Sequence, residues 1–161
     1  MVLKLFRITP FICIFFFYQS ISYSKTFDDK DLANYFSALI SLEKNKSTES
    51  LKYFESSKEL KESHPSYIKK YLFSLVLSKK INKAIKELKT TKQKNFTDFF
   101  EAHLLLVLDS LKRNDYKKSL YHLNNLKRYG QDGTYEFIIS SLLEEYIYLF
   151  KEKKIKPILD N

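Results

Sequence analysis

Histidine side chains are the groups in this sequence that suit proton transfer or metal binding near neutral pH, and there are three of them. His103 and His122 fall on the two helices of one predicted helical hairpin, where they could approach each other, whereas His64 precedes Pro65 at a hairpin end and is expected to be exposed. A zinc site needs a third ligand, and the sequence has no His-Glu-x-x-His segment or equivalent pairing. Because Cys13 is the only cysteine, a cysteine-based zinc site and a disulfide framework are excluded. We expect no metal.

The acidic residues and the glycines do not form a catalytic pattern. Neighbouring carboxylates, as in Asp28-Asp29 and Glu144-Glu145, point about 100° apart on a helix and do not converge as an acid and a base. The two glycines both lie in residues 130–133, which leaves no glycine-rich phosphate loop, and no serine sits in a Gly-x-Ser-x-Gly elbow. The sequence predicts no catalytic residue and no cofactor, and binding is the leading class of function.

The positive charge is mostly lysine. The formal net charge is +9, but only Arg7, Arg113 and Arg128 of the 28 basic residues are arginine. Arginine forms bidentate hydrogen bonds with phosphates and base edges, whereas lysine is a hydrated point charge that is common on helix surfaces. We expect no nucleic-acid partner. The alternative is a lysine-rich helical domain that binds nucleic acid or anionic surfaces without sequence specificity.

The first two dozen residues have the pattern of an export signal. Lys4 and Arg7 precede an unbroken apolar run over residues 11–18, and Ser22 and Ser24 provide the small side chains that a signal peptidase reads. We predict a signal peptide over residues 1–24, cleavage after Ser24, and a periplasmic or secreted protein. The alternative is a retained membrane anchor, although the apolar run is shorter than the roughly 20 residues that span a bilayer.

From residue 28 onward, apolar residues recur at helical spacing, and the near absence of Gly and Pro disfavours a many-stranded fold. The predicted fold class is therefore all-α. Seven helices are expected. The first covers residues 28–44, the second runs from Ser47 to just before His64, and the third follows Pro65 and carries Tyr67 to Val76. The fourth carries Ile81 to Leu88, the fifth begins near residue 98, the sixth follows Asp115 and ends near Tyr129, and the seventh covers about residues 135–153. Thr97 or Asp98 is expected to cap the fifth helix. Its run Leu104–Leu108 is apolar all round, which predicts the most buried element of the chain.

The helices form hairpins that repeat. A small residue in the second helix of each hairpin recurs after 34 and 35 residues, a large apolar residue follows it by four positions in each copy, and a turn precedes it by five. Small residues allow two helices to cross closely, and large ones fill the gap to the next helix. The predicted packing residues are Ala38, Ser50, Phe54, Ala84, Leu88, Ser119 and Leu123, and the turns are at Asn45, Lys79 and Asn114.

Two segments resemble the tetratricopeptide-repeat family. Residues 111–120 resemble the inter-helix turn of that family, and Tyr53-Phe54 followed by His64-Pro65 resembles the end of a repeat. The resemblance implies a right-handed α-solenoid of about three helical hairpins plus one extra helix. It would form one domain over residues 28–154, followed by a short tail over residues 155–161.

The match also has departures. Residues 35–154 are similar to exported tetratricopeptide proteins of alphaproteobacteria. The resemblance is compatible with a match to the N-terminal part of those proteins only. Among the first helices only Ala38 keeps the small residue of the family, because Leu72 and Val107 stand at the equivalent positions. A non-repeating helical bundle is the alternative architecture.

In the family that this chain resembles, first helices line an inner face that binds a protein or peptide. The resemblance therefore implies a non-catalytic interaction scaffold. The low charge of the face favours apolar or aromatic contacts over a clamp for a terminal carboxylate, and the alternative is that the same residues are ordinary core. The implied contact residues are Tyr35, Leu39, Leu42, Lys69, Phe73, Val76, Leu104 and Leu108.

The last predicted helix has more apolar surface than packing on the sixth helix requires. Terminal repeats need a polar outer face, but apolar side chains occupy most of residues 137–150. We expect another surface to cover this helix: a second copy of the chain, a partner protein, or further repeats. The apolar residues in the segment 156–159 are the alternative cover.

Overall fold

The computed structural model describes residues 28–151. The predicted signal peptide with Ser22 and Ser24, and the tail over residues 155–161, lie outside this range. The described residues form seven α-helices and two short 3-10 helices and contain no strand, which confirms the all-α prediction for this part of the chain. The elements are α2 (Asp29–Glu43), α3 (Ser47–Ser56), η2 (Lys58–Glu62), α4 (Pro65–Leu77), α5 (Ile81–Thr90), η3 (Lys94–Thr97), α6 (Phe100–Lys112), α7 (Tyr116–Lys127) and α8 (Tyr135–Lys151).

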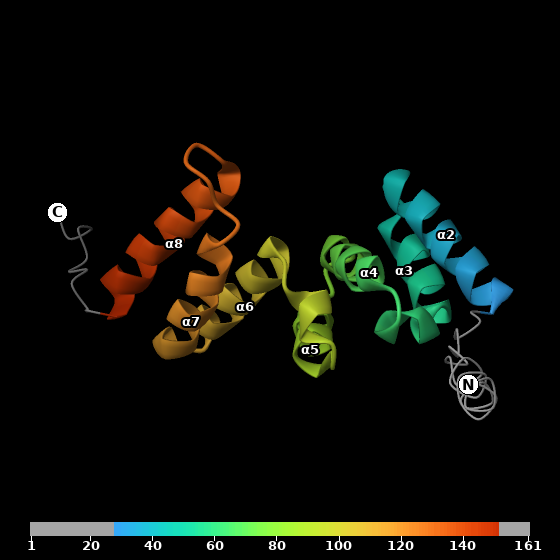
Figure 1. The fold of residues 1–161 in the computed structure, drawn as a ribbon, viewed down its shortest axis with the longest axis horizontal. Helices are drawn as coiled ribbons and strands as arrows, with labels where there is room; N and C mark the ends of the chain where they lie inside the picture. Colours follow the sequence, from blue (N-terminus) through green and yellow to red (C-terminus); the bar gives the residue numbers. More distant parts are fainter. Residues whose placement is uncertain (1–27, 152–161) are drawn as a thin grey trace, which may run out of the picture.

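The helices follow one another along the long axis of the molecule, from α2 at one end to α8 at the other (Figure 1). Three-residue connections join α2 to α3, α4 to α5, and α6 to α7. The connections between successive pairs are longer, and η2 and η3 lie in two of them. None of the helices in residues 28–151 combines the length and the hydropathy that a membrane-spanning helix requires.

The three short turns have the same backbone conformation. Their middle residues, Asn45, Lys79 and Asn114, have φ angles of 59°, 60° and 57°. In each turn the next backbone N–H donates to the carbonyl five residues earlier, with N–O distances of 2.8, 2.8 and 2.9 Å. This left-handed C-cap satisfies carbonyls at the end of a helix and reverses the chain. The turns lie where the sequence predicts them, 34 and 35 residues apart.

All seven residues predicted to pack the hairpins are buried. The clearest close approach is between α2 and α3, where the Ser50 hydroxyl donates a hydrogen bond of 2.8 Å to the Ala38 carbonyl. A larger side chain at either position would separate the two helices. Leu72 and Val107, at the positions equivalent to Ala38, are also buried.

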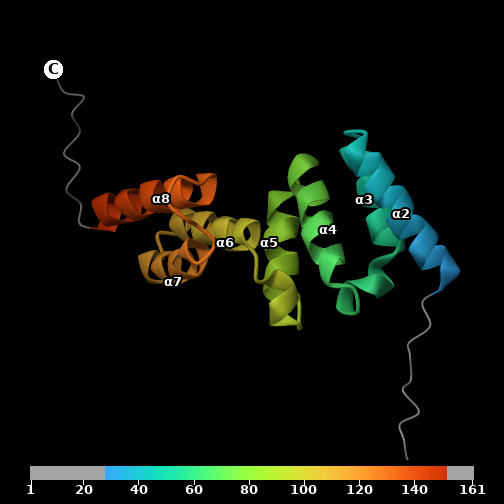
Figure 2. The same ribbon diagram turned by 45° about the horizontal axis from the view of Figure 1, so that its top comes forward.

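The core has two parts that meet at α6. Residues of α2–α5 and η2, with Ala102 of α6, form the first cluster, in which the rings of Phe54, Tyr35, Tyr67 and Tyr71 contact one another. Val107, Leu123, Leu126 and Ile147 form the second cluster, in α6, α7 and α8. Figure 2 shows α6, α7 and α8 lying across the direction of α4 and α5. The chain is thus built from two packed units that change direction at their junction.

The second helix is shorter than predicted. α3 ends at Ser56 rather than just before His64, at the point where the hydroxyl of the buried Ser57 donates to the carbonyls of Tyr53 and Phe54 at 2.9 and 3.3 Å. The 3-10 turn that follows places Leu60 in the core, fully buried. Local hydrogen bonds of serine thus end the helix before any proline does.

The predictions for α6 were wrong in two respects. Neither Thr97 nor Asp98 caps it, since Thr97 lies in η3 and the helix begins at Phe100 with Phe99 as N-cap residue. The Leu104–Leu108 run is not the most buried segment either, because Val107 alone is fully buried and Leu108 is 46% exposed. α6 packs on α7 along one face and meets the first unit along another, which leaves part of its circumference uncovered.

Candidate functional site

An apolar groove lies between α4 and α6, the first helices of the second and third hairpins, with a volume of about 400 Å³. Four of the eight predicted contact residues line it: Lys69, Phe73, Val76 and Leu104. The remaining lining comes from Lys70, Leu72, Phe99, Glu101 and Leu105. Its size falls within the ~300–1,000 Å³ range of protein ligand sites.

The walls of the groove are apolar, and its rim is charged. Phe73 is 53% exposed although it neighbours the buried Leu72. At the rim, the Lys69 ammonium lies 3.1 Å from a Glu101 carboxylate oxygen and 5.3 Å from the centre of the Phe99 ring. These contacts connect α4 to the start of α6. The arrangement can take apolar side chains, with a polar rim that fixes their orientation.

The structure places the other four predicted contact residues elsewhere. Tyr35 and Leu42 are core residues, only 5% and 8% exposed, and this corrects their assignment to a contact surface. The Tyr35 ring stacks on Tyr67, 5.9 Å between centroids, because α4 packs over this face of α2 and α3. Leu39 is half-buried against the first cluster, and Leu108 is exposed but does not line the groove.

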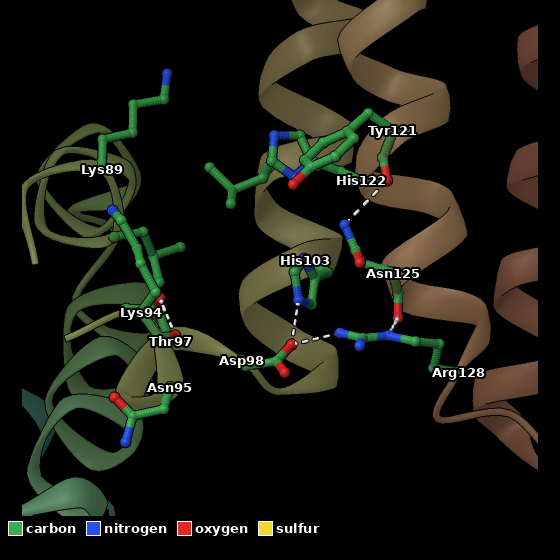
Figure 3. Close-up of a pocket in the computed structure, with 12 residues that line it drawn as sticks. Lys89, Lys94, Asn95, Thr97, Asp98, His103, Tyr121, His122, Asn125 and Arg128 are labelled. Atoms are coloured by element: carbon green, nitrogen blue, oxygen red, sulfur yellow. Dashed lines mark hydrogen bonds and ion pairs between the residues drawn. The ribbon is translucent and has the colours of Figure 1, made fainter. Parts of the chain in front are cut away.

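A second, more polar pocket of about 650 Å³ lies between α5 and η3 on one side and α6 and α7 on the other (Figure 3). It contains both histidines of the third hairpin, and the centroids of the His103 and His122 rings are 6.2 Å apart, so the expected approach occurs. His64 is remote from them in the first cluster. It is half-buried, with its ring 4.9 Å from that of Tyr35, which corrects the expectation that it is exposed.

Asp98 organises this second pocket. One carboxylate oxygen accepts hydrogen bonds from His103 Nε2 at 2.8 Å, from Arg128 at 2.8 Å and from the Tyr129 hydroxyl at 2.9 Å. The bonds from His103 and Tyr129, with the nearby Arg128 charge, hold the pKa of Asp98 below its ordinary value. The start of α6 is thereby fastened to the end of α7.

A carboxylate beside an imidazole occurs in general-base catalysis, where the other ring nitrogen faces a nucleophile. Here His103 Nδ1 is buried and has no hydrogen-bond partner among the described residues. No group of three or more His, Cys, Asp or Glu residues within residues 28–151 is arranged to hold a metal ion. The role of Asp98 is not visible in the sequence, because Arg128 and Tyr129 reach it from about 30 positions along the chain and no local spacing connects them.

His122 makes stability dependent on pH. The pKa of His122 lies below its ordinary value of 6.5. The main cause is burial of the ring, and the nearby positive charges of His103 and Lys89 contribute less. The unfolded chain therefore binds this proton more readily than the folded chain, and the stabilisation is present above about pH 6.5 and lost as the pH falls through the lower folded pKa. Urea unfolding followed by circular dichroism at about pH 7.5 and pH 5.5 should show a larger loss of stability for the wild type than for His122→Gln. Equal losses in the two proteins would contradict this assignment.

No family model matches the chain, and no match was found among curated proteins or among solved structures.

Proposed function

We propose that this chain is a non-catalytic interaction scaffold, which binds an apolar segment of a partner protein in the groove between α4 and α6. In this proposal the hairpins are tetratricopeptide-like repeats in a right-handed solenoid, and residues 1–24 direct the protein to the periplasm or out of the cell. Three equivalent left-handed turns and a buried small residue at the same place in each second helix support the repeat architecture.

The observation that carries the proposal is the exposed phenylalanine side chain of Phe73, which lines the apolar groove. A side chain of this size would be expected in the core, yet half of it is open to solvent between two first helices. An apolar side chain of a partner would cover this surface, and the burial would contribute a favourable free energy of about 25 cal/mol per Å² of apolar area removed from water. Burial of the exposed ring therefore favours binding.

The charges around the groove indicate the kind of peptide. Lys69 is engaged with Glu101, whereas Lys70 lines the groove and has no ion pair within residues 28–151. We infer a ligand with two or more large apolar side chains and an acidic residue that reaches Lys70. Such a ligand binds through apolar contacts with one favourable charge interaction at the rim.

Three lysines join neighbouring elements through ion pairs, which disfavours their use in a nucleic-acid surface. Lys61, Lys83 and Lys89 form ion pairs with Glu87, Glu55 and Asp109 at 2.6, 2.5 and 2.6 Å. These pairs connect η2 to α5, α3 to α5, and α5 to α6. Because each of these lysines is paired with a carboxylate, its positive charge attracts a phosphate group less strongly.

A peptide-display selection on the purified protein tests the proposal. Selected peptides should be rich in apolar residues, and Phe73→Asp should weaken their binding at least about tenfold, as measured by fluorescence polarisation. Phe36→Asp is the matched control, because Phe36 is a 58% exposed phenylalanine on the first helix α2, outside the groove. Circular dichroism checks that both variants keep the helical content of the wild type.

Salt dependence separates the proposal from its alternative. Binding in an apolar groove should change little between about 50 and 200 mM salt, whereas binding through phosphate contacts falls by orders of magnitude. The proposal fails if the selected peptides bind Phe73→Asp and the wild type equally well. It also fails if oligonucleotides bind more tightly than peptides do and lose that binding in salt.

A further inference from the structure

A third pocket, of about 610 Å³, lies between α5 and the end of α6 and shares no residue with the groove between α4 and α6. Four of the side chains that line it are basic and only Asp109 is acidic, so the lining has a formal charge of +3. The basic side chains are Lys86 and Lys89 on α5, and Lys112 and Arg113 at the end of α6. A concave site with an excess of one sign of charge concentrates ions of the opposite sign.

Asp109 holds two of these cations in place. Its side chain is only 12% exposed and accepts a hydrogen bond of 2.6 Å from the Lys89 ammonium, and Arg113 pairs with the same carboxylate from four residues further along the chain. Burial alone would raise the pKa of Asp109, but the hydrogen bonds from Lys89 and Arg113 outweigh burial and hold the pKa below its ordinary value. Lys89 and Arg113 are therefore positioned before a ligand binds, which reduces the entropic cost of binding.

Lys86 and Lys112 are the two cations of the pocket without a carboxylate partner. Neither forms an ion pair within residues 28–151, and the lining contains no acidic side chain besides Asp109. The Asn82 amide, also in the lining, adds a neutral hydrogen-bond donor. The pocket thus offers an anion two unpaired ammonium groups, next to two cations that a single carboxylate does not fully neutralise.

The charge and the size of the pocket indicate the class of ligand. One carboxylate would leave most of this positive charge uncompensated, whereas a phosphate ester carries about −1.5 to −2 at pH 7 and has three acceptor oxygens. Lysine and arginine both bind phosphate groups in proteins. The volume of about 610 Å³ is within the range of sites for small organic ligands, so the pocket has room for the molecule that carries the phosphate. We propose that the pocket between α5 and α6 binds a small phosphorylated molecule, with Lys86 and Lys112 as its main charge partners.

A titration of the full chain with inorganic pyrophosphate at constant ionic strength, followed by nuclear magnetic resonance, tests the site. We expect the largest changes in amide chemical shift in residues 82–90 and 109–113. Replacing both unpaired lysines, Lys86→Gln with Lys112→Gln, should weaken pyrophosphate binding at least about tenfold. Lys52→Gln is the matched control, because Lys52 is an exposed lysine of α3 that lies outside the pocket and has no ion pair among the described residues.

Two further measurements make the result specific. Acetate, titrated at the same ionic strength, should bind at least about tenfold more weakly than pyrophosphate, which separates recognition of phosphate from a general attraction of anions. Phe73→Asp should leave pyrophosphate binding unchanged, because Phe73 lines the groove and not this pocket, so the two proposals can fail separately. Circular dichroism checks that the double variant keeps the helical content of the wild type.

The proposal is wrong if the double variant binds pyrophosphate as tightly as Lys52→Gln does, or if the shift changes lie outside α5 and the end of α6. It is also wrong if acetate binds as tightly as pyrophosphate, or if no binding is detected at about 10 mM pyrophosphate. Tighter binding to vesicles of phosphatidic acid than to pyrophosphate, at equal phosphate concentration, would contradict it too, because the ligand would then be a membrane lipid.

Discussion

Replacing Phe54 with alanine should cost about 3–5 kcal/mol of folding free energy, a large part of the roughly 5–15 kcal/mol that stabilises a typical domain. Phe54 is fully buried, and its ring contacts those of Tyr35, Tyr67 and Tyr71 with centroid distances of 6.1, 5.4 and 5.9 Å. The Tyr67 hydroxyl also donates a hydrogen bond to the Phe54 carbonyl, and burial raises the pKa of Tyr67 well above its ordinary value. The substitution removes the ring that joins three helices.

Urea unfolding followed by circular dichroism measures this loss. Because the chain has no tryptophan, its near-ultraviolet signal comes mainly from its 12 tyrosines, three of which belong to the cluster. Phe36→Ala is the control, since an exposed ring should change stability by no more than about 0.5 kcal/mol. A loss below about 1 kcal/mol for Phe54→Ala would show that the aromatic cluster does not hold α2, α3 and α4 together.

Leu123→Ala should destabilise the second unit by about 2–5 kcal/mol and leave the first unit folded. Leu123 is fully buried in the cluster of α6, α7 and α8, and none of its buried cluster neighbours belongs to α2–α5. Since two separate clusters share only α6, we expect faster amide hydrogen exchange in residues 100–151 than in residues 28–90.

Mass spectrometry of exchanged peptides distinguishes the two segments. Leu108→Ala supplies the same chemical change on α6 at a 46% exposed position and should leave exchange almost unchanged. If Leu123→Ala accelerated exchange equally in both segments, the two clusters would be one cooperative unit, and the division of the core would have no energetic meaning.

The local features of this fold were predictable from sequence because they depend on residues a few positions apart. The turns at Asn45, Lys79 and Asn114 and the small residues that follow them were identified from their spacing alone. The end of α3 at Ser56 was not, because serine hydrogen bonds to nearby carbonyls competed with a pattern that otherwise continued as helix.

The candidate site was predicted in part. Helical periodicity shows which residues share a face, but it does not show which faces other helices cover. Phe73 and Leu104 remain accessible, whereas Tyr35 and Leu42 sit under α3 and α4 in the first cluster. The contacts of Asp98 with Arg128 and Tyr129 depend on how η3 and α7 approach each other, which no spacing in the sequence encodes.

The position of the groove has a mechanical consequence. One wall, with Leu72, belongs to the first cluster, and the other, with Leu104, packs against the second, so the groove spans the junction at which the chain changes direction. Any bending at this junction changes the width of the groove. A ligand bound there would contact both sides of the junction and reduce the motion of the two clusters relative to each other. A mutation that increases this motion would weaken binding even where the mutated residue does not contact the ligand.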